Sequence, residues 1–91
     1  MTVNHESLNQ EKLYSFYMYQ LNDPLVSLLI QVPEITGSFS PDNLQIIEPQ
    51  LRENEIEIVK DFFKFVFEEN LTFGQGNIKD VFKTYILSKS M

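Results

Sequence analysis

Residues 55–69 constrain the fold of this chain more than any other stretch, because their charged and apolar side chains separate at helical spacing. On a helix with about 100° between residues, five charged side chains fall within an arc of about 100°. These are Glu57, Lys60, Asp61, Lys64 and Glu68. The apolar side chains fill an arc of about 180° on the opposite side. An apolar face of this width predicts a central helix that contacts several neighbours. Its members are Ile56, Ile58, Val59, Phe62, Phe63, Phe65, Val66 and Phe67.

Two motifs predict where the first helices begin. A first helix is expected from about residue 6 to residue 21, with Asn4 as its N-cap. Asp23 and Pro24 then combine a capping residue with a proline at the first helical position, which predicts a fresh helix start.

The second helix is expected to be short, over residues 25–31, because Pro33 lacks a backbone N–H and restricts the residue before it. Residues 25–32 are apolar at six of eight positions. A buried strand has a similar pattern, so helix and strand both remain open for this segment.

The C-terminal half is divided by proline and glycine. A loop over residues 33–39 precedes Ser40 and Pro41, which are expected to open a third helix. Pro49 either ends that helix or kinks a longer one. The central helix is expected to start between residues 51 and 55 and to continue to about residue 70.

A glycine turn separates the central helix from the last one. Gly74 and Gly76 are expected to supply backbone freedom for an αα-hairpin, and Asn77 to cap a helix over residues 78–88. A weaker interpretation places a small anion at that helix start, beside Lys79.

Length and composition complete the prediction of the fold class. Ninety-one residues suit one domain, residues 1–91, and an apolar content of 43% supports a packed core. No cysteine is present, so no disulfide stabilises the chain. We expect an all-α bundle of about four to five short helices, in which the helix near 55–69 is central and paired with a C-terminal helix near 78–88.

The first helix is the candidate functional element. Its apolar and aromatic side chains spread around most of its circumference. A single small domain cannot bury all of them. The residues predicted to bind a partner are Tyr14, Tyr17, Met18 and Tyr19. The alternative is that the tyrosines cover the edge of the core and keep their hydroxyls in water.

No group of residues predicts catalysis, a cofactor or a metal. The segment from Gly74 to Gly76 begins like a dinucleotide fingerprint but lacks the third glycine. His5 has neither a second histidine nor a cysteine to complete a zinc site. Lys60 and Lys64 disfavour a cation near the carboxylates of the central helix. We therefore expect a protein that is not an enzyme.

Charge and hydropathy limit the partners. A net charge of −6 opposes direct binding of nucleic acid. The longest nearly apolar stretch, residues 25–32, is too short to cross a bilayer. The N-terminal residues lack a signal-peptide pattern, and the cytoplasm is the expected location.

These features predict a small acidic protein-binding module that serves as a regulator, an inhibitor or an accessory subunit, and that is also compatible with a homodimer. The alternative is a nucleic-acid mimic that inhibits a DNA-binding or DNA-processing enzyme. Lys60 and Lys64 weaken that likeness to a row of phosphates. The acidic residues in question are Glu48, Glu53, Glu55, Glu57, Asp61, Glu68 and Glu69.

Overall fold

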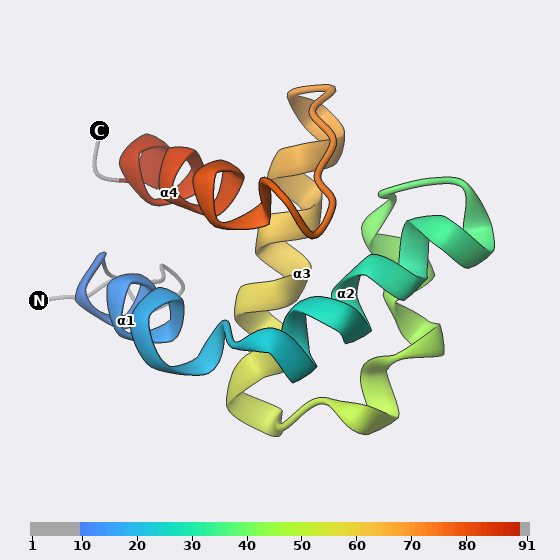
Figure 1. Ribbon diagram of the computed structural model, residues 1–91, viewed down its shortest axis with the longest axis horizontal. Coiled ribbons are helices and arrows are strands. Elements are labelled where there is room, and N and C mark those ends of the chain that lie inside the picture. Colours follow the sequence, from blue (N-terminus) through green and yellow to red (C-terminus); the bar gives the residue numbers. More distant parts are fainter. Residues whose placement is uncertain (1–9, 90–91) are drawn as a thin grey trace, which may run out of the picture.

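The computed structural model describes residues 10–89, and every regular element in that range is helical (Figure 1). The expected all-α bundle is confirmed, and residues 25–32 are helix. The predicted cap Asn4 and the lone His5 lie outside the described residues. In chain order the elements are α1 (Gln10–Ser15), the π-helix η1 (Phe16–Gln20), α2 (Asp23–Thr36), the 3-10 helices η2 (Pro41–Ile46) and η3 (Glu48–Gln50), α3 (Glu53–Glu68) and α4 (Ile78–Lys89).

Helix α3 is central, as its broad apolar face predicts. In Figure 1 it stands upright behind α2, and α4 crosses its upper half. Phe62 is buried, and its ring centroid lies 4.9 Å from that of Phe82 and 5.3 Å from that of Phe73. Phe67 is the exception on this face: it is 54% exposed, because it lies at the edge of the apolar arc beside Lys60.

Helix α4 pairs with α3 and also packs on the first helical segment. Phe82 is buried between them, with its ring 5.4 Å from that of Phe16. Ile78 and Tyr85 are buried on the same side of α4, as the sequence pattern predicts. The two helices cross steeply in Figure 1, so they do not lie side by side as an antiparallel hairpin would.

The expected stop of the second helix at Pro33 is wrong. Helix α2 continues through Pro33 to Thr36, which keeps Val32 buried in the core. A proline removes only one hydrogen bond from the ladder, whereas a residue with positive φ ends the helix outright. Gly37 supplies that conformation with φ 76°, and its N–H donates to the Pro33 carbonyl at 2.7 Å. The predicted loop therefore begins at Gly37.

The start of α2 also differs by one residue from the prediction. Asn22 is the N-cap, and its side-chain oxygen accepts the Leu25 N–H at 3.3 Å. Asp23 is the first helical residue and Pro24 the second.

The expected third helix is 3-10 rather than α. Leu44 and Ile47, three residues apart, are both buried, and the Ile47 N–H donates to the Leu44 carbonyl at 3.0 Å. A 3-10 helix repeats every three residues, so this spacing keeps both side chains on the core side. Pro49 neither ends nor kinks an α-helix, because it lies inside the second 3-10 turn.

Two asparagines shape the chain after α3. Asn70 has φ 58°, and the Leu71 N–H donates to the Val66 carbonyl at 2.9 Å, which closes α3 with a Schellman motif. Asn77 directly precedes α4, but its side-chain oxygen accepts the Gly74 N–H at 2.7 Å and so stabilises the preceding turn. Gly37 is the only glycine with positive φ, so the expected backbone freedom of the glycine turn is not used.

Candidate partner-binding surface

The first helical segment changes from α to π geometry at Phe16. The Leu21 N–H donates to the Phe16 carbonyl, five residues earlier, at 2.8 Å. Phe16 and Leu21 are both buried, and Leu13 is buried one turn before Phe16. Residues 17–20 thus occupy a single wide turn held between two core side chains. Such π turns are rare in proteins, and those that occur often lie at functional sites.

The four predicted partner-binding residues divide between surface and core. Tyr14, Met18 and Tyr19 are 56%, 51% and 77% exposed. Tyr17 is half-buried, and its ring stacks on that of Phe82 with the centroids 6.2 Å apart. Tyr17 therefore lies at the edge of the core, as the alternative interpretation of the tyrosines predicts. The other three side chains face solvent.

A hollow of about 430 Å³ adjoins this surface at Tyr19. It lies where η1, the start of α2, the end of η3 and the start of α3 meet. The sequence pattern did not predict it, because its walls come from segments about 30 residues apart. Its lining residues are Tyr19, Gln20, Asn22, Pro24, Leu25, Leu28, Gln50, Arg52 and Glu55.

Arg52 is the most distinctive group in this hollow. It is the chain's only arginine and precedes α3 directly. Its backbone N–H donates to the Glu55 carboxylate at 2.8 Å, whereas its guanidinium has no hydrogen bond or ion pair within residues 10–89. Arginine and tyrosine are both enriched at protein interfaces. The single arginine of the sequence is therefore the one feature that could have indicated an interface at this hollow.

Asp61 differs from the other charged residues of α3, which the sequence pattern treats as one solvated face. Its carboxylate accepts the Tyr85 hydroxyl at 2.6 Å and lies 2.8 Å from the Lys89 ammonium. Burial raises the pKa of Tyr85, and the hydrogen bond to Asp61 and the negative charges of Asp61 and Glu57 raise it further. Because this environment opposes the phenolate, the Tyr85 hydroxyl keeps its proton and donates a hydrogen bond to the Asp61 carboxylate. This hydrogen bond joins α4 to α3.

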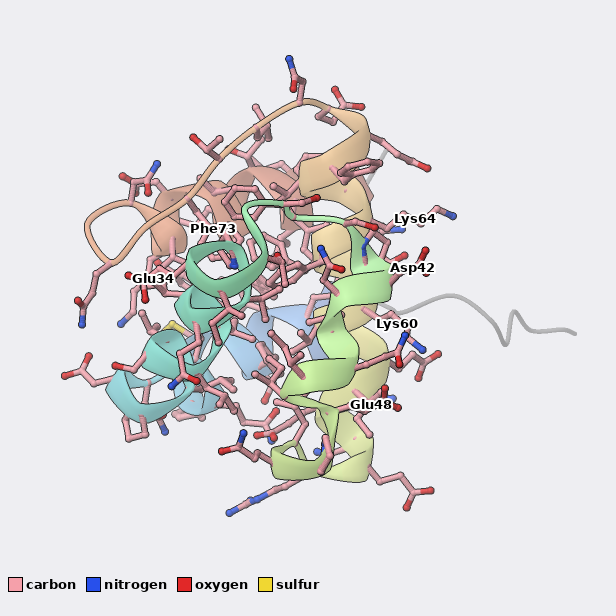
Figure 2. The ribbon with its side chains drawn as sticks, turned by 90° about the vertical axis from the view of Figure 1, so that its right-hand side faces the viewer. Glu34, Asp42, Glu48, Lys60, Lys64 and Phe73 are labelled. Atoms are coloured by element: carbon pink, nitrogen blue, oxygen red, sulfur yellow. The ribbon has the colours of Figure 1, made fainter. Side chains whose placement is uncertain are left out.

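The remaining charges on α3 are mixed in sign. Figure 2 shows Lys60 and Lys64 of α3 on the same side of the molecule as Asp42 and Glu48 of the 3-10 helices. Both lysines are exposed. Positive groups therefore interrupt the acidic side chains on this side of the molecule.

Neither a metal site nor a membrane span is found in the described part of the chain. Over residues 10–89, no three acidic or histidine side chains are grouped as metal ligands would be. No helix in that range combines the length and the apolar character needed to cross a bilayer. Comparison with protein-family models, with curated proteins and with solved structures finds no match to this chain.

Proposed function

We propose that this chain is a small acidic protein-binding module, acting as a regulator, an inhibitor or an accessory subunit in the cytoplasm. Its binding surface consists of Tyr14, Met18 and Tyr19. The observation that supports this proposal is the π turn between Phe16 and Leu21, which anchors the segment in the core while Met18 and Tyr19 face solvent. Tyr17 is left out of this surface because its half-buried ring packs on Phe82.

The clustering of these three residues distinguishes them from other exposed apolar side chains. Tyr14, Met18 and Tyr19 occur within six positions of one helical segment. Single exposed apolar residues are ordinary on a protein surface, whereas several of them on one short segment indicate an interaction site. The scattered residues, each on a different element, are Ile35, Ile46, Phe67 and Leu87.

The chemistry of the three side chains also suits an interface. Tyrosine offers a large apolar ring with few rotatable bonds and a hydroxyl that can bind across the contact. Methionine adapts its shape to a partner. Leu13, Phe16 and Leu21 already bury the inner side of the segment, so the exposed three are not needed to fill the core.

Site-specific photocrosslinking tests the proposal. A benzoylphenylalanine placed at position 18 is compared with the same group at position 35, which is 67% exposed on α2. We expect position 18 alone to capture one protein from the native host, and untagged protein to compete for it. Identical captures from both positions, or no competition, would contradict the proposal.

Matched charge substitutions measure the contribution of the surface. Met18→Glu is expected to weaken binding of the captured protein by about tenfold or more, because a carboxylate would be buried in an apolar contact. Ile35→Glu adds the same charge elsewhere and is expected to change binding less than about twofold. Equal effects of the two variants would count against the surface.

Two other functions are outcomes of the same experiment. Crosslinking of position 18 to a second copy, with a dimer in sedimentation at micromolar concentration, would identify the partner as this chain itself. Binding that vanishes steeply with salt and is unaffected by Met18→Glu would instead favour the nucleic-acid mimic. The exposed Lys60 and Lys64 argue against mimicry.

A further inference from the structure

We propose that the hollow bordered by Tyr19 and Arg52 binds an acidic side chain of the protein partner, next to an apolar residue of the same partner. This inference rests on the proposed function, because the hollow adjoins the exposed surface at Tyr19. It adds the chemistry of the partner, which the aromatic surface alone does not specify.

Two side chains of the hollow, Asn22 and Arg52, offer donors to an acceptor. Asn22 uses its side-chain oxygen for the Leu25 N–H, which leaves its NH2 group as a donor. One oxygen of the Glu55 carboxylate accepts the Arg52 backbone N–H. The Arg52 guanidinium has five N–H donors and no partner within the described residues. A carboxylate matches these two donor groups and can bind a guanidinium in bidentate fashion.

The charge and the walls of the hollow restrict the occupant further. Arg52 and Glu55 are its only charged lining residues. The single guanidinium can pair directly with one carboxylate, whereas the negative charge of Glu55 disfavours a polyphosphate or a nucleic acid. Pro24, Leu25 and Leu28 form an apolar part of the wall. A volume of about 430 Å³ suits one or two side chains of a bound segment.

Two capped peptides provide the probe. N-acetylated and C-amidated Leu-Glu-Leu is compared with Leu-Gln-Leu, which has nearly the same shape without the charge. Each is titrated into the ¹⁵N-labelled full chain and followed by NMR, including the Arg52 side-chain Nε–H. We expect the acidic peptide to bind about tenfold more tightly, with the largest shift changes at Tyr19, Asn22 and Arg52.

Matched variants assign the effect to the guanidinium. Arg52→Gln is expected to weaken binding of the acidic peptide by about tenfold. Lys60→Gln removes the same charge from an exposed position on α3 and is expected to leave binding unchanged. Arg52→Lys keeps the charge but loses the planar fork, so an intermediate affinity is expected. Equal binding of both peptides, or equal effects of Arg52→Gln and Lys60→Gln, would overturn the inference.

The outcome is separable from that of the proposed function. Met18 does not line the hollow, so Met18→Glu is expected to leave peptide binding unchanged while it weakens partner capture. Partner capture that depends on Met18, without a preference for the acidic peptide, would refute only the hollow's role. Peptide binding at Arg52 without specific capture at position 18 would refute the aromatic surface instead.

Discussion

Helix α3 and the first helical segment, residues 10–20, are both rich in aromatic residues, yet the structure uses them in opposite ways. In α3 the rings of Phe62 and Phe63 are buried at the centre of the core. In the first segment the core takes Phe16, whereas Tyr14 and Tyr19 face solvent. A similar density of rings thus builds the fold in one region and leaves a surface exposed in the other.

The difference lies in the residues between the rings. Charged side chains recur along α3 at helical spacing and determine which face must remain in water. Between Lys12 and Asp23 the chain has no charged residue, so no local signal orients the first segment. Tyrosine also tolerates either environment, because its hydroxyl can remain in water while its ring packs. The use of an aromatic residue therefore depends on its polar neighbours.

Truncating a core ring of α3 should have the largest effect. Phe62→Ala is expected to lower the free energy of unfolding by about 3–5 kcal/mol, because it leaves a cavity among four aromatic neighbours. Urea unfolding followed by circular dichroism measures this, with Phe62→Leu as a milder variant. Phe67→Ala, on the same helix but exposed, is expected to change stability by less than about 1 kcal/mol. Equal losses would contradict the division of α3 into core and surface.

The tie between α3 and α4 should have the next largest effect. Asp61→Ala removes the acceptor of the buried Tyr85 hydroxyl and is expected to cost about 1–3 kcal/mol. In a double-mutant cycle with Tyr85→Phe, the two losses should not add, because both remove the same hydrogen bond. Strict additivity would show that the two groups do not interact. Lys89→Ala, which removes a partly exposed ion pair, is expected to change stability by less than about 1 kcal/mol.

The raised pKa of Tyr85 also predicts a dependence on alkaline pH. The folded state favours the neutral phenol, so this contribution to stability is fully present below the unfolded-state pKa of about 10. It should be lost progressively as the pH rises from about 10 towards the higher folded-state pKa. Unfolding measured between about pH 8 and pH 11 tests this. Tyr85→Phe should show a shallower alkaline loss than the natural chain, and parallel curves would refute the prediction.

The smallest effects should separate the tyrosines of the first segment. Tyr17→Ala is expected to cost about 1–2 kcal/mol, because its half-buried ring stacks on Phe82. Tyr19→Ala is expected to change stability by less than about 0.5 kcal/mol, because the side chain faces solvent. Thermal unfolding of the two variants gives the comparison. A larger loss for Tyr19→Ala would show that its ring belongs to the core.

Most of the helical elements could be predicted from local patterns. The charge pattern and the glycine turn located the ends of α3 and α4 to within a few residues. The extension of α2 through Pro33 differs from the prediction because one proline removes a single hydrogen bond, and the helix ends only at the positive φ of Gly37. The 3-10 geometry of residues 41–50 likewise follows from where Leu44 and Ile47 meet the core.

The candidate site was only partly visible in the sequence. The excess of aromatic residues in the first segment predicted one group of partner-binding residues, Tyr14, Tyr17, Met18 and Tyr19. The sequence offers no means of separating Tyr17 from the others, because the distinction arises from its contact with Phe82, 65 positions later. The hollow at Arg52 was missed for the same reason, since no local pattern brings residues 19–28 next to residues 50–55.

The sequence by itself determined the all-α class and the inward and outward faces of α3, because helix propensity, caps and charge spacing act between residues close in the chain. Only the tertiary structure decided which tyrosines face solvent, which carboxylate receives the buried hydroxyl of Tyr85 and where the hollow forms. These features depend on contacts between elements far apart in the chain. Whether a side chain is buried is a property of its neighbours in space.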